Sequence, residues 1–420
     1  MVPALPDYEQ AAAQVAAYAA ELRRTPPAAE SVDLAAAAGR VLARPLHADS
    51  DQPPFARTTR DGFACRARDA SAHRPLPIAG STRAGDPPPD PLPAGAAWEI
   101  MTGAPVPEDA DAVMMIEHVE AAEGKVRLLA PRKLAPGENI ISQGAQARKG
   151  DELLPAGTTV GFAQIALAAA CGHTALDVYR RPLVAILSTG DELVPIEQHP
   201  APGQIRNSSA PMLAAMAAAA GGEPWILPIA GDSEQALDAA LRDAASADAL
   251  VLTGGVSAGK FDLVEPALTR AGARFFFTGA RIQPGKPIVF AEITRLLAEG
   301  RTHCPVFGLP GNPVSSAVTF LLFAAPVAAA LAGRLHIGPR FALARLGSDP
   351  GRHPRSGLTR FLPALCDFSM AAGKLPEVEL VAWQGSGDQA ALARSNCLLV
   401  VPEENPEPFE KGATVRILLP

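Results

Sequence analysis

The stretch "ALVLTGGVSAGKFD" at residues 249–262 joins a short apolar run to a loop of small residues. The run is typical of a buried strand, and the Gly-Gly pair ends it. Similar units precede it: "LVAILS" (183–188) leads to "SSAPMLAAMAAAAGG" (208–222), and "PWILPIA" leads to "EQALDAALRDAASA". Because strands that alternate with helices form parallel sheets with helices on both faces, residues 181–333 are predicted to form a doubly wound α/β domain.

The chain outside this region has a different texture. Residues 8–22 are predicted to form a helix that "TPP" (25–27) ends, and a second helix is predicted over about 31–43. Residues 47–147 alternate short apolar runs with clusters such as "GDPPPDPLPAG", which indicates a β-rich domain with long loops. From residue 334 to 420 short strands return, which predicts a C-terminal β domain.

Composition excludes several classes of protein. A net charge of −7 and a pI near 5.7 argue against a nucleic-acid or membrane-surface binder, so a local site must meet any anionic substrate. The five cysteines are scattered, which fits a reducing compartment. The N-terminus lacks the pattern of a signal peptide, and "AVTFLLFAAPVAAALAG" contains Pro326 and indicates a buried helix rather than a membrane span. We therefore expect a cytoplasmic protein.

The loops after the predicted strands carry the candidate site, because ligands of doubly wound sheets bind beyond the carboxyl ends of the strands. Asp191 and Glu192 follow the strand at 183–188, and Asp232 is expected to cap the next helix in a capping box with Gln235. In "GLPGNPVSS" (308–316), Asn312 is an N-cap candidate and Pro313 a first helical residue. The amides of the following residues, Val314, Ser315 and Ser316, would face the crevice as an anion site.

The glycines of the opening stretch have two interpretations. They let main-chain N–H groups approach a phosphate or carboxylate closely, or they serve a tight connection between a strand and a helix. Glycine-rich ends on the neighbouring strands favour the first. The loop is neither a Walker A sequence nor a GxGxxG fingerprint. The residues expected to bind a ligand here are Thr253, Gly254, Gly255, Ser257 and Gly259.

Charges of both signs stand in these loops. Lys260 and Lys286 are two of only seven lysines, and their glycine and proline neighbours favour anion binding over a solvated surface role. Helix capping or an exposed turn would explain each acidic residue of these loops taken singly. Taken together, the acidic residues suggest a Mg²⁺ site that is shared with substrate phosphates. These acidic residues are Asp61, Asp191, Glu192, Asp232 and Asp262. Cys171 and His173 have no second pair for zinc, and no GxSxG or Ser/His/Asp order occurs, so positioning and electrostatics must drive the chemistry.

The stretches together resemble the molybdopterin molybdenumtransferases, whose animal relative is the C-terminal domain of gephyrin. The resemblance covers nearly the whole chain. It rests on "DQPPFARTTRDGFA" (51–64), "IMTGAPVPEDADAVMMIE" (100–117), "ILSTGDELV" (186–194), "LTGGVSAGKFD" (252–262), "QPGKPIVF" (283–290), "GLPGNPVSS" (308–316) and "QGSGDQAALARSN" (384–396).

The resemblance implies an enzyme that inserts molybdenum from molybdate into adenylylated molybdopterin, releases AMP and uses a divalent metal. It also implies an elongated homodimer whose cleft lies between the sheet domain of one subunit and the β domain of the other. A molybdopterin adenylyltransferase and apo-molybdoenzymes are the implied partners. By motif, the residues that act on metal and pyrophosphate are Asp61, Thr102, Glu192, Asp232 and Asp262, all but Thr102 as metal ligands. The molybdate and pterin side takes Lys286, Pro310, Pro313 and Ser315.

The family's four domains divide this chain further. A small α+β linker domain would comprise 26–46 and 148–180, and the inserted β-rich domain 47–147. The α/β molybdopterin-binding domain would comprise 5–25 and 181–333, with the C-terminal β domain at 334–420. The expected fold class is therefore α/β multidomain, with a doubly wound mixed sheet.

This sequence departs from the family pattern at several positions. Arg60 precedes the aspartate of the first motif, and Gly144 is followed by Ala145 and Gln146 where the family has two carboxylates. The family's lysine before "PGKP" is Gln283. Its arginines and serines further on become Leu358, Pro363, Ala390 and Ala391, although Arg355 and Arg360 lie nearby. These departures leave open a non-catalytic paralogue that binds or carries molybdopterin or the finished cofactor. An adenylyltransferase, which needs little beyond the sheet module, is a third reading.

Overall fold

The computed structural model describes residues 5–71, 73–255, 263–297, 300–348, 357–369, 374–403 and 410–420. Contacts divide the chain into two compact units. The first comprises Met1–Ala43, Gly157–Gly161 and Leu176–Pro420, and the second comprises Arg44–Ala156 and Phe162–Ala175. This division is coarser than the four predicted domains, whose boundaries stay a prediction.

A six-stranded mixed sheet is the centre of the first unit, as the sequence predicted. Four neighbouring strands of this sheet are parallel, so their carboxyl ends lie at the same edge. The last of the four pairs antiparallel with a fifth strand, which in turn pairs antiparallel with the sixth. In spatial order the strands are β16 (Glu223–Ile226), β13 (Leu183–Ser188), β17 (Ala249–Thr253), β21 (Gly300–Leu309), β20 (Val289–Leu297) and β18 (Arg274–Phe277). The register sets Ser188 beside Thr253 and Thr253 beside Leu309, so the loops that follow these three strands start at one level.

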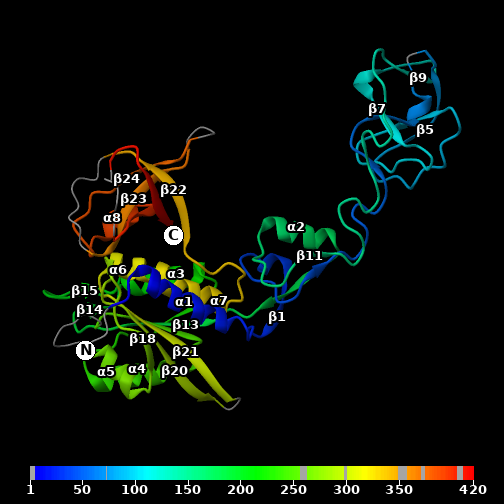
Figure 1. Cartoon of the computed structure of the whole chain (residues 1–420). Helices are drawn as coiled ribbons and strands as arrows, with labels where there is room; N and C mark the ends of the chain where they lie inside the picture. The colour runs from blue at the N-terminus through cyan, green and yellow to red at the C-terminus, as the bar shows by residue number, and fades with distance from the viewer. Residues whose placement is uncertain are drawn as a thin grey trace. The chain divides into compact units, whose positions relative to one another are not determined.

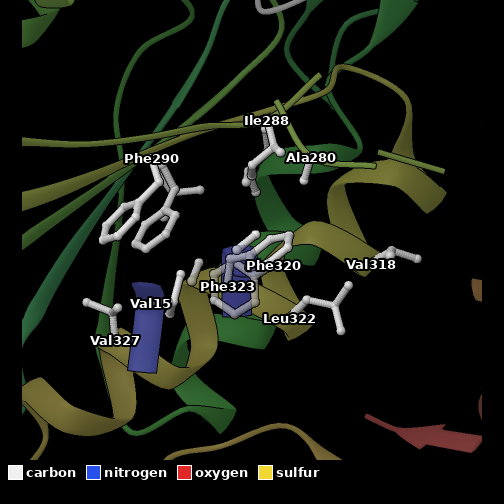
Figure 2. Close-up of a cluster of buried hydrophobic side chains, with 14 of the residues drawn as sticks. Val15, Ala280, Ile288, Phe290, Val318, Phe320, Leu322, Phe323 and Val327 are labelled. Atoms are coloured by element: carbon white, nitrogen blue, oxygen red, sulfur yellow. The ribbon is translucent and has the colours of Figure 1, made fainter. Parts of the chain in front are cut away.

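Helices cover both faces of this sheet (Figure 1). One face packs against α1 (Tyr8–Leu22), α3 (Ser209–Ala219), α6 (Pro313–Thr319) and α7 (Ala325–Leu331), which a π-helical turn at Phe320–Ala324 joins to α6. The other face packs against α4 (Glu234–Asp243) and α5 (Val264–Arg270). Figure 2 shows part of the first of these cores, a buried cluster to which Phe290 of β20 and Phe320 and Phe323 of the π-helical turn belong. Phe290 and Phe307 stack with their ring centroids 4.7 Å apart.

The structure confirms two predicted helices, at residues 8–22 and from Pro313 onward, and local features of the sequence explain both. Helix α1 begins with a capping box, in which Asp7 accepts from the Gln10 amide at 2.8 Å, and it buries one face including Val15 and Tyr18. The segment Pro313–Leu331 has a mean hydropathy of 2.0, enough by length and composition to cross a membrane, yet 83% of that window is buried inside the fold. Burial on this scale is typical of a core helix, as Pro326 suggested.

The helix predicted over 31–43 is wrong. The segment instead forms β1 (Ala29–Asp33), which pairs with β12 (Ala175–Tyr179), and a single 3-10 turn at Leu34–Ala36. Gly39 then adopts a φ of +75°, and isolated bridges join the following residues Val41 and Leu42 to Thr159 and Val178. Pairing with strands distant in sequence has overridden the helix propensity of the alanines.

The C-terminal domain is a small barrel, as predicted in its β content. Its strands run in the order β19 (Ile282–Gln283), β23 (Thr359–Asp367), β24 (Glu377–Leu380), β22 (Arg340–Leu346), β26 (Thr414–Leu419) and β25 (Cys397–Val401), and β25 pairs back with β23. The short helix α8 (Gln389–Arg394) precedes β25. In sequence, β19 lies between β18 and β20 of the sheet domain, and it pairs in parallel with β23 of the barrel. A segment of the sheet domain therefore contributes one strand to the sheet of the barrel.

Contacts fix the barrel against the sheet domain. Tyr8 of α1 packs edge-on against Phe361 of β23, with ring centroids 5.4 Å apart. Arg281 lies 3.6 Å from Asp7 and 3.2 Å from Glu403, so one guanidinium joins α1 to the barrel. These apolar and ionic contacts pack the barrel directly against the sheet domain.

The second unit contains a six-stranded sheet and is β-rich, as predicted. Its order is β7 (Ala112–Met115), β4 (Gly62–Cys65), β6 (Ala97–Ile100), β5 (Leu76–Thr82), β9 (Lys125–Leu128) and β8 (Val119–Ala122). The remaining elements are β2 (Leu46–His47) paired with β11 (Glu152–Leu154), β3 (Arg57–Thr58) paired with β10 (Ile140–Ile141), and α2 (Phe162–Ala170). In the first unit, β14 (Leu193–Val194) pairs with β15 (Ile205–Arg206).

Candidate active site

A cleft of about 670 Å³ lies beyond the carboxyl ends of the parallel strands. The loops after β13, β16, β17 and β21 form one wall, and the segment that follows β19 forms the floor. The C-terminal barrel forms another wall, which contacts the loop after β21 through Ser386. The lining residues are Thr189, Gly190, Glu192, Asp232, Gly254, Gly255, Ile282 to Pro287, Pro310, Gly311, Asn312, Ser315, Leu358, Trp383, Gly385 and Ser386. Four strand ends that are far apart in sequence therefore meet at one site, which is where the loop pattern predicted it.

Gly254 and Gly255 let the loop after β17 approach the loop after β13. A Cβ on Gly254 would lie 2.4 Å from the Thr189 carbonyl oxygen, and both glycines have positive φ angles, +96° and +61°. The Gly254 amide donates to Leu309 at 3.2 Å, so it serves the sheet rather than a ligand. The Gly255 amide has no partner among the described residues. Gly254 therefore gives close packing, and Gly255 offers the N–H group that was predicted to meet an anion.

The Thr189 hydroxyl is an unsatisfied group in this cleft. The residue is 4% exposed, and its Oγ1 has no hydrogen-bond partner among the described residues. Its backbone amide is occupied, since it donates to the Thr253 carbonyl at 2.9 Å. Leaving a buried hydroxyl unpaired costs about 1–3 kcal/mol, so a polar ligand atom that met it would recover this loss.

Two carboxylates line the same wall. Glu192 folds over the bare face of Gly190, where a Cβ would lie 2.5 Å from its Oε2. Asp232 is fixed by Asp191: the Asp191 amide donates to Asp232 Oδ2 at 3.3 Å, and the Asp232 amide donates to Asp191 Oδ1 at 3.0 Å. Of the three, Glu192 and Asp232 line the cleft, and Asp191 acts as a support beside it.

Asp232 does not cap helix α4, contrary to the prediction. Ser233 is the N-cap, and its side chain accepts from the Ala236 amide at 3.2 Å. The helix starts one residue later than expected, which places Ala236 rather than Gln235 at the position a capping box needs. The Asp232 carboxylate is thereby left to face the cleft.

The loop after β21 is tied to both domains. Thr253 is buried, and its hydroxyl donates to the Pro310 carbonyl at 3.1 Å, so it holds the loop rather than lining the cleft. Ser316 donates to the same carbonyl. Asn312 stands at the N-cap position as predicted, yet its side chain makes no capping hydrogen bond, and its Nδ2 donates at 3.0 Å to Ser386 Oγ of the barrel. Pro313 is the first helical residue, as predicted, and is not among the residues that line the cleft.

The N-terminus of α6 offers one free amide rather than the three predicted. The Val314 amide donates to the Ser386 carbonyl at 3.0 Å, and the Ser316 amide donates to the Asn312 carbonyl at 2.9 Å. Only the Ser315 amide has no partner among the described residues, and Ser315 lines the cleft. The difference arises because the barrel loop binds the helix end, a contact between segments 72 residues apart that local sequence does not reveal.

Lys286 is exposed and lines the floor of the cleft. No carboxylate among the described residues forms a salt bridge with it. Gly285 before it must lack a side chain, because a Cβ would lie 2.5 Å from Thr319 Cγ2 of α6. The backbone is thus pressed against the helix, and the ammonium group is available to an anion.

Asp61 and Thr102 belong to the second unit, where they form one local pair. Asp61 Oδ1 accepts from both the amide and the hydroxyl of Thr102 at 2.6 Å. The Thr102 hydroxyl and then its backbone amide lower the pKa of Asp61, so the side chain is a carboxylate at neutral pH. Both residues are exposed, as is Arg60 beside them.

Several predicted residues cannot be placed. Ser257, Gly259 and Asp262 lie outside the described residues, as do Lys260 and Arg355. Within the parts of the chain that are described, no group of three or more His, Cys, Asp or Glu side chains could hold a metal ion. The metal set of Asp61, Glu192, Asp232 and Asp262 therefore stays a prediction, of which Glu192 and Asp232 are seen to share the cleft.

Sequence departures from the family pattern fall in two kinds of place. Gln283 and Leu358 line the cleft, which makes that side less charged than the pattern would. Pro363 and Ala391 are buried in the barrel.

Three residues that line the cleft were not predicted from the sequence: Thr189, Trp383 and Ser386. Thr189 lies within the quoted "ILSTGDELV", and Trp383 immediately precedes "QGSGD".

Comparisons with known proteins cover the chain in succession. Family models match the MoeA N-terminal region (domain I and II) at residues 7–172, a "probable molybdopterin binding domain" at 185–330, and the MoeA C-terminal region (domain IV) at 348–419. The molybdopterin molybdenumtransferase of Nostoc sp. is 37% identical over 387 residues, 89% of this chain and 85% of the relative. That of Bacillus subtilis is 35% identical over 394 residues, with 90% and 87% covered. The crystal structure of a molybdopterin biosynthesis moeA protein from Pyrococcus horikoshii is 28% identical with a TM-score of 0.78, covering 99% of this chain and 100% of its own.

Proposed function

The chain belongs to the molybdopterin molybdenumtransferase family and is an enzyme, and we propose that it inserts molybdenum from molybdate into adenylylated molybdopterin with release of AMP. The observation that carries the proposal is the meeting of four strand-end loops at one cleft. There, two amides and one hydroxyl that have no partner among the described residues line a volume of about 670 Å³ together with a lysine and two carboxylates. That volume suits a ligand of nucleotide size.

The amides and Lys286 are proposed to hold the anionic parts of the substrates. The Gly255 and Ser315 amides come from loops that follow neighbouring strands, and both are proposed to donate to oxygens of one phosphate. Lys286, with Pro310, Pro313 and Ser315, is proposed to form the molybdate and pterin side. Pro310 and Pro313 contribute through the shape of the loop, since the Pro310 carbonyl already accepts from Thr253 and Ser316.

The donor set on the sheet wall fits Mg²⁺. The described lining contains two carboxylates, Glu192 and Asp232, and one ammonium, Lys286, so its formal charge is −2 + 1 = −1 before an anionic substrate enters. Mg²⁺ is commonly held by one or two carboxylates plus substrate phosphates, and the buried Thr189 hydroxyl is a further oxygen donor. When bound, Mg²⁺ would neutralise charge that develops on the pyrophosphate as AMP leaves.

The protein's own contribution is positioning. The Asp191 amide fixes the Asp232 carboxylate through one hydrogen bond, the Asp232 amide donates in return to the Asp191 carboxylate, and Gly190 gives room for the carboxylate of Glu192. The tie between Asn312 and Ser386 holds the barrel wall over the anion-binding loop. Groups held in place before the reaction contribute more to catalysis than groups that must reorganise during it.

Residues beyond the described cleft complete the proposal. Asp262, Ser257 and Gly259 are proposed to extend the loop after β17, with Asp262 turned toward the metal. Asp61 and Thr102 are proposed to act on metal and pyrophosphate from the β-rich domain of a second subunit, in a homodimer. The ionised state of Asp61 suits this role. We further propose a cytoplasmic location, an adenylyltransferase as the source of the substrate, and apo-molybdoenzymes as recipients.

Release of AMP tests the proposal. Purified protein given adenylylated molybdopterin, molybdate and Mg²⁺ is expected to release AMP and form molybdenum cofactor over many turnovers. Omission of molybdate serves as the control. Tight binding without AMP release would identify a non-catalytic carrier, and consumption of ATP with free molybdopterin would identify an adenylyltransferase. No observation in the structure favours the carrier.

A further inference from the structure

Trp383 gives the cleft an aromatic face. It lies in the barrel loop between β24 and α8 and is half-buried. Among the described residues that line the cleft, it is the one aromatic side chain. Leu358 and the backbone of Gly385 continue the same wall, and neither carries charge. The barrel wall is therefore uncharged, with the Ser386 hydroxyl as its polar side-chain group, whereas the sheet wall carries the carboxylates of Glu192 and Asp232. The sheet wall also carries the Gly255 and Ser315 amides, which have no partner among the described residues.

The indole is held in a fixed position. Its buried side packs against both the core of the sheet domain and the core of the barrel. On one side of it, the Val381 amide donates to the Pro363 carbonyl at 3.0 Å. On the other, the Gln384 amide donates to the Asp388 carboxylate at 3.0 Å, and the same carboxylate accepts from the Ala391 amide at 2.9 Å. A rigid aromatic surface binds a flat ring at low entropic cost.

We infer that Trp383 stacks on a flat nitrogen heterocycle of the substrate while the strand-end loops of the sheet wall bind its phosphates. The inference rests on the proposed function, which supplies two such rings, adenine and pterin. Heterocycles have π faces that stack on aromatic side chains largely without regard to their hydrogen-bonding edges. A cleft with one uncharged wall that includes an aromatic residue and one wall with charged groups matches a ligand with a flat ring at one end and phosphates at the other.

Equilibrium binding tests this role separately from turnover. The chain has three tryptophans, and replacing the other two (W98F and W225F) leaves Trp383 as the single indole fluorophore. AMP is titrated against its emission, and AMP and a 6-substituted pterin are each titrated by calorimetry. Trp383→Leu removes the ring but keeps an apolar side chain, and Trp383→Phe keeps an aromatic face. Trp225→Leu is the control, because Trp225 is in β16 and lies outside the cleft.

Stacking predicts a definite pattern. Trp383→Leu should weaken binding of at least one probe roughly 5- to 150-fold, the range that one stacked base contributes. Trp383→Phe should stay within about threefold of the wild type, and Trp225→Leu should match it. If AMP is the probe that weakens, adenine occupies the face; if the pterin, the pterin ring does. Unchanged affinity for both probes in a folded Trp383→Leu protein, or no binding of either probe to the wild type, would overturn the inference. Failure of AMP release with this pattern intact would instead count against the proposed function alone.

Discussion

Gly254→Ala is the substitution that tests the strand-end cleft most sharply. The added Cβ would lie 2.4 Å from the Thr189 carbonyl oxygen and 2.8 Å from its hydroxyl, both far inside contact distance. The residue would also have to keep a φ of +96°. Backbone strain of this kind costs about 1–3 kcal/mol, and overpacking adds about 1–3 kcal/mol. We therefore expect a loss of about 2–6 kcal/mol in the free energy of unfolding, together with displacement of the loop from Thr189.

Gly272→Ala separates the two terms. Gly272 has a φ of +74°, and a Cβ there would meet nothing within 4 Å, so this variant carries the strain without the clash. Urea unfolding of both variants should show Gly254→Ala to be less stable than Gly272→Ala by about 1–3 kcal/mol. Its kcat/KM for AMP release should fall at least about tenfold, while Gly272→Ala stays near wild type. Equal stabilities, or a Gly254→Ala enzyme with unchanged kcat/KM, would refute the account of this loop.

Three further predictions concern the carboxylates and the thiols. Glu192→Gln and Asp232→Asn should each raise the Mg²⁺ concentration for half-maximal AMP release at least about tenfold, and unchanged Mg²⁺ dependence would remove them from the metal site. Hydrogen bonds from the backbone, first that of Ala391, lower the pKa of Asp388, so its contribution to stability is full above the ordinary value of 3.8 and is lost as pH falls through the lower folded value. Acid unfolding of Asp388→Asn should accordingly be less steep than that of the wild type over this range, whereas identical curves would deny the role. All five cysteines are buried, and burial raises the pKa of the Cys65 thiol to about 12, so a thiol reagent at pH 8 should label the native protein far more slowly than the unfolded one. Rapid labelling of a native thiol would show that the fold opens there.

Local patterns predicted most of the sheet domain. Each apolar run, at 183–188 and at 249–253, is followed directly by its glycine loop, so the alternation of strands and helices and the sheet edge expected to hold the site follow from short-range signals. The spatial order of the strands was not predicted. Glu192, Asp232, Gly255 and Ser315 were found this way, and all line the cleft. Helix α1 was equally readable, because its capping box and buried face lie within fifteen residues.

Long-range contacts account for what the sequence did not reveal. The segment at 31–43 has helix-forming alanines, but pairing with β12 some 140 residues away determines its structure. The amide of Val314 looked free, and the Ser386 carbonyl of the barrel occupies it. Trp383 joined the site for the same reason, since only the fold brings the barrel loop to the strand ends.

The most direct test of the central claim is a crystal structure of the protein with AMP and Mn²⁺, whose anomalous scattering marks the Mg²⁺ position. The account predicts Mn²⁺ between the carboxylates of Glu192 and Asp232, and a phosphate that accepts from the amides of Gly255 and Ser315. A nucleotide bound away from this cleft, or bound within it with Mn²⁺ distant from both carboxylates, would contradict it.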